Sequence, residues 1–259
     1  MGRKMIDRTG ERGKNNFGSE MIIVEYRTNK DIDVYFPKYD WTAKNREYNK
    51  FKKSQIKCPY ERRIYGVGYL GEGKYKCKEN GKATKIYDTW HSMLQRCYSE
   101  EYHKKYPTYK DCIVCDEWYN FQNFAKWYYD NYYKVDEERM ELDKDILFKH
   151  NKIYSPETCI FVPQTINLLF TKRNNDRGES VIGTSPVNGK YVVHCSLINP
   201  RTGKSKGGYL GRYNSQEEGF KIYKYYKERN IKEVADYFKD RIPNELYDTL
   251  YNYEVEIDD

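Results

Sequence analysis

One segment constrains the fold of this chain more than any other: Met140–Asn167, which reads MELDKDILFKHNKIYSPETCIFVPQTIN. Its pattern predicts a strand, a polar loop rich in turn residues, a short apolar strand and then a helix. Asp143 falls on the first strand and Asn167 on the helix. A strand and a helix that bracket one cavity can present these two oxygen-bearing side chains to the same point.

The rest of the chain limits the size of the hydrophobic cores around this segment. The 259 residues suffice for one large domain or for two to three small ones. Because 38% of the residues are hydrophobic and 33% are charged, we expect several small cores. The 29 tyrosines can fill such cores while their hydroxyls stay in water.

The N-terminal region predicts a flexible arm over residues 1–16 and a small β-barrel-like module over residues 17–65. In the module, MIIVEYRTNKDIDVYF alternates apolar and polar residues in two runs around the turn-like Thr28–Asp31. One interpretation is a structural or docking module that binds a protein partner. Four lysines cluster at its end: Lys50, Lys52, Lys53 and Lys57. They leave open the alternative of a barrel that contacts nucleic acid.

Two amphipathic helices are predicted before the Met140 segment, at Tyr87–Tyr98 and Asp116–Tyr133. Aromatic side chains recur along the second at near-helical spacing, namely Trp118, Phe121, Phe124, Trp127 and Tyr128. An aromatic stripe of this kind more often forms a core than a base-stacking platform. We therefore predict that it packs inside the protein.

The C-terminal region predicts a sheet followed by a helix. YVVHCSLI and GYLGRY read as strands joined by the basic turn NPRTGKSKG. Ser215 is predicted to cap a helix, with Glu218 at the capping-box position. This helix is expected to pack three aromatic side chains on the sheet: Phe220, Tyr223 and Tyr226. The last residues predict a short amphipathic helix and an acidic tail in solvent.

Several of these segments resemble a known nuclease family. LDKDIL, YSPETCIFVP and the helix ending at Asn167 resemble the strand–strand–helix metal finger of the HNH (His-Me finger) endonucleases. YDTWHSMLQRCY and YKDCIVCDEWYNFQNFAKWY resemble phage-encoded members of that superfamily. The unit from KYVVHCSLI through YLGRYNSQEEGFKIYKYYKE resembles the apetala-two DNA-binding domain, which is found fused to HNH homing endonucleases.

The resemblance implies an α+β fold with a small N-terminal β unit. A central ββα-metal unit with flanking helices follows, and then a three-stranded sheet plus a helix. The implied units are an arm (1–16), a β module (17–65), an HNH-like nuclease domain (66–172), an apetala-two-like domain (178–240) and a C-terminal helix with an acidic tail (241–259).

The resemblance also assigns roles in the central segment. Asp143 and Asn167 would hold one Mg²⁺ or Mn²⁺, since hard cations prefer oxygen ligands. Lys144 occupies the position of the usual catalytic histidine. Beside Asp143 and Asp145 this lysine is favoured as a cation, which suits a phosphate better than a proton-accepting role.

The missing histidine leaves the catalytic base open. His150, in the following loop, can substitute as the base, and we count Lys144, Asp145 and His150 as the candidate catalytic residues. The alternative for the acidic pair is two solvated carboxylates on a strand.

The cysteines suggest a second metal. Cys112 and Cys115 have the C-x-x-C spacing of a zinc knuckle. Cys97 and Cys159 are the best candidates to complete a structural Zn²⁺ site. The alternative is four buried thiols in a reduced protein.

Double-stranded DNA is the predicted partner. The net charge of +7 is compatible with a polyanion. In the resembled domain the sheet enters the major groove, which requires outward-facing cations. The candidates are Lys190, His194, Arg201, Lys204, Lys206 and Arg212. The alternative is an ordinary solvated basic hairpin.

These features favour a phage or mobile-element DNA endonuclease or nickase. The competing hypothesis is a DNA-binding regulator or anti-defence protein on a scaffold that no longer cuts, which Lys144 favours. A third is a module that binds an acidic protein. The sequence contains no apolar run of membrane-spanning length and no hydrophobic signal segment, so we expect no membrane partner and a cytoplasmic location, in a bacterial host if the chain is phage-encoded.

Overall fold

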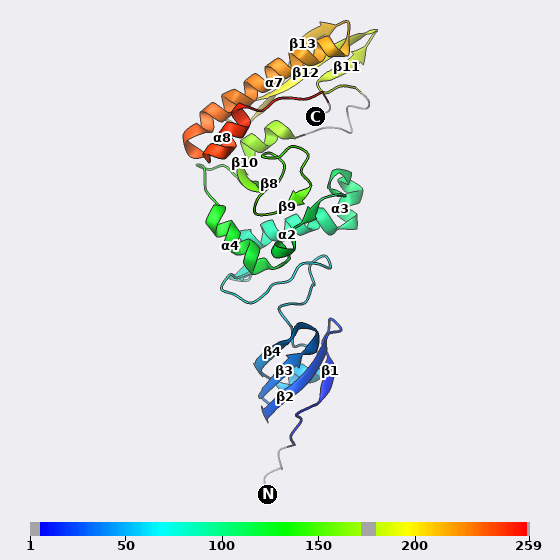
Figure 1. Ribbon diagram of the computed structural model, residues 1–259, viewed down its shortest axis with the longest axis vertical. Coiled ribbons are helices and arrows are strands. Elements are labelled where there is room, and N and C mark those ends of the chain that lie inside the picture. The colour runs from blue at the N-terminus through cyan, green and yellow to red at the C-terminus, as the bar shows by residue number, and fades with distance from the viewer. Residues whose placement is uncertain (1–5, 172–179, 258–259) are drawn as a thin grey trace. The chain divides into compact units, whose positions relative to one another are not determined.

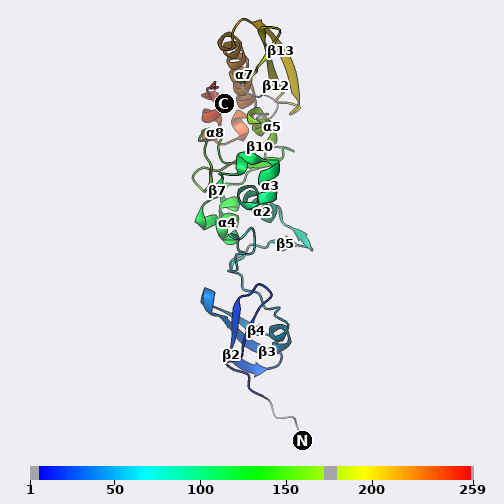
Figure 2. The same ribbon diagram turned by 90° about the vertical axis from the view of Figure 1, so that its right-hand side faces the viewer.

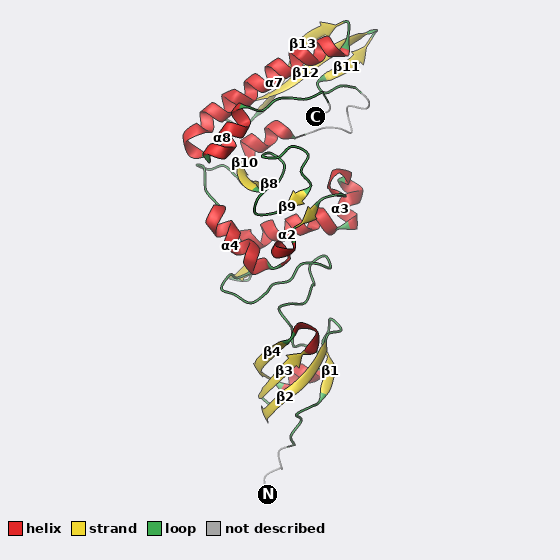
Figure 3. Ribbon diagram, viewed as in Figure 1, coloured by secondary structure: helices red, strands yellow, loops and turns green. Residues whose placement is uncertain are grey.

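The computed structural model describes residues 6–171 and 180–257 of an α+β chain. Residues 1–5 of the predicted arm and residues 172–179 of the predicted linker lie outside the described residues. The chain divides into two compact units. The first comprises Met1–Lys110 and Val114–Lys126, and the second comprises Asp111–Ile113 and Trp127–Asp259. Figure 3 shows strands in both the N-terminal and C-terminal regions and helices between them.

The first unit begins with a four-stranded antiparallel sheet in the order β1-β2-β3-β4. Its strands are β1 (Arg12–Lys14), β2 (Glu20–Thr28), β3 (Asp31–Phe36) and β4 (Trp41–Arg46), followed by helix α1 (Tyr48–Lys52). Thr28 pairs with Asp31, so the predicted hairpin is confirmed. The sheet starts at Arg12, inside the segment expected to be a flexible arm, because β1 pairs with β2. The core contains Met21, Ile23, Ile32, Val34, Phe36, Ala43, Phe51, Ile56 and Cys58.

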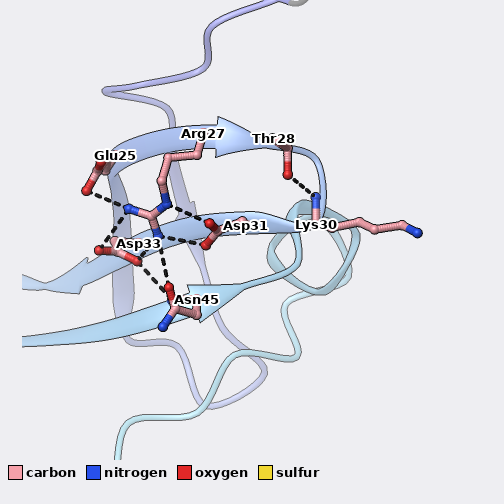
Figure 4. A network of polar contacts seen from close by, with 7 residues as sticks. All are labelled: Glu25, Arg27, Thr28, Lys30, Asp31, Asp33 and Asn45. Carbon is pink, nitrogen blue, oxygen red and sulfur yellow. Dashed lines mark hydrogen bonds and ion pairs between the residues drawn. The ribbon is translucent and has the colours of Figure 1, made fainter.

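A polar network around Arg27 joins three strands of this sheet (Figure 4). The guanidinium lies 2.7 Å from both Asp31 and Asp33 and 2.6 Å from Glu25. It also donates to the side-chain oxygen of Asn45 at 3.2 Å. Its hydrogen bonds lower the pKa of the carboxyls of Asp31 and Asp33.

The Arg27 network predicts that acid destabilises the N-terminal sheet. A carboxyl with a lowered pKa in the folded state contributes stability above the pKa of an unfolded aspartate, about 3.9. This contribution is lost as the pH falls through the lower folded value. We therefore expect Arg27→Gln to reduce the stability difference between pH 6 and pH 3, measured by thermal unfolding. Arg12→Gln, which removes a single exposed ion pair with Glu20, should leave that difference unchanged.

The remainder of the first unit is mainly helical. Its elements are β5 (Lys78–Glu79), β6 (Lys82–Ala83), α2 (Lys85–Tyr98), α3 (Glu100–Lys105), β7 (Ile113–Val114, at the boundary), a 3-10 turn (Asp116–Tyr119) and α4 (Phe121–Asn131, which continues into the second unit). The prediction of a single helix over Asp116–Tyr133 was wrong. Asn120 has an extended backbone and its side chain accepts the N–H of Gln122, so α4 begins only after it.

The aromatic residues of these helices form a core, as predicted. Trp90 and Trp118 are fully buried, and the Trp90 indole donates to the carbonyl of Trp118 at 2.7 Å. The rings of Trp118 and Phe124 meet edge to face, with 5.1 Å between their centroids. The hydrophobic face of α2 is thereby held against the segment that precedes α4.

The second unit contains the Met140 segment. Its elements are β8 (Met140–Asp143), β9 (Ile153–Tyr154), β10 (Ile160–Pro163), α5 (Gln164–Asn167) and a 3-10 turn (Leu168–Phe170). Strands β8 and β10 are antiparallel neighbours. The predicted order of strand, loop, strand and helix is therefore present, with the helix shorter than a typical one.

The C-terminal part of the second unit is a three-stranded antiparallel sheet, β11 (Thr184–Val187), β12 (Lys190–Ile198) and β13 (Ser205–Tyr213). Helix α7 (Gln216–Phe238) lies along it, and α8 (Asn244–Tyr251) lies beside α7 (Figure 1). Ser215 accepts the N–H of Glu218 at 3.2 Å, so the predicted cap is confirmed.

Asn230 fixes α7 to the end of β12. Its side-chain oxygen accepts the N–H of Ile198 at 2.7 Å, and its amide donates to the carbonyl of Ile198 at 2.9 Å. Tyr223 is buried as predicted, whereas Tyr226 is exposed. The face of α7 that is buried continues instead through Asn230 and Val234, which are spaced seven and eleven residues after Tyr223.

The acidic tail was expected to be in solvent, but part of it is held against the protein. The side chain of Val255 is buried. Lys224 donates to the backbone carbonyl of Val255 at 2.8 Å, and the backbone N–H of Val255 donates to the carboxylate of Glu228 at 2.8 Å. A tail that reads as charged in sequence is thus anchored through its one buried apolar side chain and its backbone.

In residues 6–171 and 180–257, no helix is both long enough and apolar enough to cross a membrane.

Candidate functional site

The strand pair of the Met140 segment places Asp143 at one end and the helix at the other. Asp143, the last residue of β8, pairs with Ile160, the first of β10. Met140 pairs with Pro163, and α5 begins at the next residue. Figure 2 shows α5 beside β10. Asn167 is half-buried at the end of α5.

The carboxyl of Asp143 is bound to the backbone of its own loop. One oxygen, Oδ1, accepts the N–H groups of Asp145 at 2.9 Å and of Ile146 at 2.8 Å. Burial, followed by the negative charge of Asp145, raises the pKa of Asp143 to about 6. The Asp143 carboxyl also has a side-chain hydrogen bond with the carboxyl of Asp145.

Lys144 is a buried cation. Its exposed fraction is 7%, and its ammonium lies 3.1 Å from Asp145 and 5.7 Å from the centre of the Tyr154 ring. Burial alone would lower the pKa of Lys144, but the charge of Asp145 and the other acidic groups around it outweigh burial, and the pKa is raised. The geometry thus favours Lys144 as an ammonium over a neutral base.

The loop between β8 and β9 is held by a residue that the sequence analysis did not single out. Asn151 donates from one side-chain amide to the carbonyls of Lys144 at 2.6 Å and of Ile153 at 2.7 Å. The preceding His150 is exposed and has a φ of 63°, a left-handed conformation. The sequence gives only a weak signal for this role of Asn151, because the hydrogen-bond partners of an asparagine in a loop are set by the fold.

The C-terminal tail reaches the same loop. Lys149 donates to the carbonyl of Glu254 and lies 3.5 Å from the carboxylate of Glu256. Its ammonium also lies 4.4 Å from the centre of the Tyr253 ring. The loop that carries His150 is therefore connected to the segment that α7 anchors.

Helix α5 is fixed at its start by Glu138. The hydroxyl of Thr165 donates to Glu138 at 2.7 Å, and the backbone N–H of Thr165 donates to the same carboxylate at 3.3 Å. These bonds fix the start of α5, which spans only Gln164–Asn167. Asp143 and Asn167 each carry an oxygen of the kind that Mg²⁺ or Mn²⁺ prefers, although the β8–β10 register places Asp143 and the start of α5 at opposite ends of the strand pair.

The four cysteines of the predicted zinc site are distributed over both units. Cys97 and Cys115 belong to the first, and Cys112 and Cys159 belong to the second. Burial raises the pKa of Cys159 to about 12 and also raises that of Cys112. In the part of the chain that the structure describes, no three His, Cys, Asp or Glu side chains form a group that could hold a metal ion. The structural zinc stays a prediction.

The C-terminal sheet has one face toward α7 and one away from it. Val193 and Thr184 lie close to Gly219 of α7, where an added Cβ would come within 3.0 Å of Val193. Side chains alternate along a strand, so Lys190 and His194 of β12 belong to the opposite face. Arg212 shares that face, because it pairs with Val192.

The predicted DNA-contacting residues do not all share this outer face. All six are exposed: Lys190, His194, Arg201, Lys204, Lys206 and Arg212. Lys206 pairs with Leu197 and so belongs to the side of α7, while Arg201 and Lys204 lie in the turn between β12 and β13. None of the three strands contains an Asp or Glu.

The outer face also carries an aromatic residue that the sequence analysis did not include. Tyr209 has an exposed fraction of 61% and pairs with His194, with 5.7 Å between the ring centroids. Exposed rings beside cations are typical of surfaces that contact nucleic-acid bases or sugars. The sequence signal that could have identified Tyr209 was its position among the polar residues of a predicted strand.

A groove of about 450 Å³ lies between α5 and the turn of the sheet. Its lining includes Gln164 and Thr165 from α5, and Arg201 and Gly203 from the turn. An added Cβ at Gly203 would come within 2.8 Å of the Thr165 hydroxyl, so the turn approaches the helix closely. Arg201 is thereby brought next to the helix that ends in Asn167.

Comparisons with protein families, with curated proteins and with solved structures found no match.

Proposed function

We propose that the chain is a phage or mobile-element DNA endonuclease or nickase of the HNH type, acting on double-stranded DNA in the cytoplasm of a bacterial host. The observation that supports the proposal most is the β8–β10 pair leading directly into α5, with Asp143 at the end of one strand and Asn167 on the helix. The acid-free outer face of the C-terminal sheet supports DNA as the substrate.

The proposed site uses residues of both the strand pair and the helix. Asp143 and Asn167 would hold Mg²⁺ or Mn²⁺, which would supply stabilisation of the negative charge on the phosphodiester. The hydrogen bonds to Oδ1 orient Asp143, and Glu138 orients the helix of Asn167. Lys144 stays cationic and offsets the acidic charge of the loop.

Two groups on the loop are candidates to accept a proton from the attacking water. His150 is exposed, and histidine is the side chain that most often serves as a general base. Asp145 is exposed but is bound to Lys144. Because this ion pair occupies Asp145, His150 is the better candidate.

Cleavage of supercoiled plasmid by the full-length protein tests the proposal. We expect nicked or linear product with Mg²⁺ or Mn²⁺ and none with EDTA. Binding of the same DNA is measured in parallel by gel shift, so that an inactive protein is distinguished from one that does not bind. Lack of cleavage with every divalent ion tried would overturn the endonuclease assignment.

The raised pKa of Asp143 predicts that metal binding depends on pH. A proton and a cation compete for the same carboxylate, so Mn²⁺ affinity should rise about tenfold per pH unit up to about pH 6 and level off above it. Titration of Mn²⁺ followed by electron paramagnetic resonance between about pH 4.5 and 8 measures this. An affinity that is constant over that range would remove Asp143 from the ligand set.

A second candidate function is DNA binding without cleavage, as a regulator or an anti-defence protein. The pairing of Lys144 with Asp145 favours it, because a buried ammonium stands where the resembled family has its base. In the plasmid assay this candidate predicts salt-sensitive binding with no product under any metal.

A further inference from the structure

The N-terminal module carries a concentrated basic segment next to its sheet. Residues 44–57 contain six cations and a single acid, Glu47. The six side chains are all exposed: Lys44, Arg46, Lys50, Lys52, Lys53 and Lys57. They belong to the end of β4, helix α1 and the turn that follows, and we call them the basic segment.

Acids elsewhere in the module already have partners. Glu25, Asp31 and Asp33 surround Arg27, and Glu61 is buried beside Arg63. Within the basic segment, Lys50 lies 3.7 Å from Glu47 and Lys52 lies 3.5 Å from Glu11.

The other four cations of the segment have no such partner in the described part of the chain, and Lys44 is one of them. The remaining three are Arg46, Lys53 and Lys57. The surplus positive charge of the module is therefore concentrated at this segment.

The backbone under these cations is ordered. The N–H of Tyr48 donates to the carbonyl of Asn29 at 2.9 Å. Phe51 is buried and lies so close to Gly13 that an added Cβ there would come within 3.1 Å of its ring. The basic segment is thus presented on a folded surface, which lowers the entropic cost of binding a partner.

We infer that the basic segment binds the sugar–phosphate backbone of duplex DNA as a contact separate from the C-terminal sheet. The inference rests on the proposed function in that DNA is the partner of the chain. Five of the six cations are lysines, a residue that is depleted in protein–protein interfaces but serves as a point charge for phosphate. The contact contributes affinity and leaves base recognition to other surfaces.

The test is the salt dependence of DNA binding by the full-length protein. Affinity for a duplex of about 30 base pairs is measured by fluorescence anisotropy between about 50 and 300 mM KCl. The variant R46Q/K53Q/K57Q removes three of the four cations that have no ion pair in the described residues. Lys44 is left in place because its charge acts on Asp33 of the Arg27 network.

A matched control removes the same charge from other exposed positions of the first unit. K38Q/K78Q/K82Q lies on the turn after β3 and on the β5–β6 hairpin. A third variant, K190Q/R212Q, removes cations from the outer face of the C-terminal sheet. Thermal unfolding of each variant confirms that it is folded.

The inference predicts a smaller slope of log affinity against log salt for R46Q/K53Q/K57Q. The slope should fall by about 0.9 for each phosphate that the variant no longer neutralises, and by about 2.7 if all three cations bind phosphate. At low salt its affinity should fall on the order of tenfold or more, with the control unchanged. Equal losses of affinity in both triple variants, or no loss in the first, would overturn the inference.

The experiment separates this inference from the proposed function. If only K190Q/R212Q weakens binding, the basic segment is not a DNA contact while the sheet still is. If the wild type binds DNA through the basic segment but does not cleave plasmid, the endonuclease proposal fails alone. If the wild type does not bind duplex at low salt, both are overturned.

Discussion

Replacing Asp143 with asparagine is expected to lower metal-dependent plasmid cleavage by about 100-fold or more. The carboxylate is the only charged ligand in the proposed site, and the loss of one charge-stabilising group typically costs about 10² to 10³ in rate. Asparagine retains an oxygen that can accept the N–H groups of Asp145 and Ile146, so the loop should keep its conformation. Asn167→Ala, which removes the second oxygen ligand, should also reduce cleavage strongly.

The stability of the Asp143 variant separates a functional role from a structural one. A carboxyl with a raised pKa is more stable protonated in the folded state, so its ionisation destabilises the metal-free protein as the pH rises from about 4 to 6. Asp143→Asn should therefore be at least as stable as the wild type at pH 7 without metal. Glu157→Gln, an exposed change of equal charge in the same segment, is the matched control. Cleavage by Asp143→Asn at the rate of this control would show that Asp143 is no metal ligand.

Replacing Glu61 with alanine is expected to destabilise the N-terminal module by about 3 to 5 kcal/mol, the range found when one partner of a buried charged pair is removed. The exposed fraction of Glu61 is 2%. Its carboxylate accepts the side-chain amide of Asn15 and the N–H of Cys58, and it lies 3.7 Å from the Nε of Arg63. Alanine would leave these groups without their partner in a buried environment.

Denaturant unfolding of the full-length protein measures the effect of Glu61→Ala, with the two units followed as separate transitions where they occur. Glu20→Ala is the control, because it removes an exposed carboxylate 2.9 Å from Arg12, and such surface pairs contribute about 0 to 1 kcal/mol. If the two variants unfold at the same denaturant concentration, the buried network does not stabilise the module. Glu61→Gln, which keeps an acceptor but removes the charge, should fall between them.

Local patterns in the sequence predicted much of the secondary structure. The Thr28–Asp31 hairpin and the Ser215 cap were predicted from residues close together in the chain, and both are present. The strand, loop, strand and helix order of Met140–Asn167 is also present. Such features depend on turn chemistry, capping and side-chain period, which act within a few residues.

Three predictions about the helices and the tail were wrong, one about a helix boundary and two about which side chains are buried. In each case a tertiary contact or a competing local hydrogen bond decided the outcome. Asn120 interrupts the helix predicted over Asp116–Tyr133, because its side chain caps α4. The aromatic pattern placed Tyr226 on the buried face of α7, whereas the hydrogen bonds of Asn230 to Ile198 fix a face that leaves Tyr226 exposed. A charged tail was assigned to solvent, yet Val255 is buried.

By itself the sequence determined the order of the elements and the types of oxygen donor that the Met140 segment carries. Tertiary structure decided the chemical state of those donors. Burial raises the pKa of Asp143. Lys144 stays a cation because the charge of the neighbouring Asp145, together with other acidic groups, outweighs burial. Likewise, only the strand register showed that Lys206 faces α7 while Arg212 faces away from it. The burial of a side chain, and the face of the sheet on which it lies, depend on partners distant in the chain, which residue type and spacing do not encode.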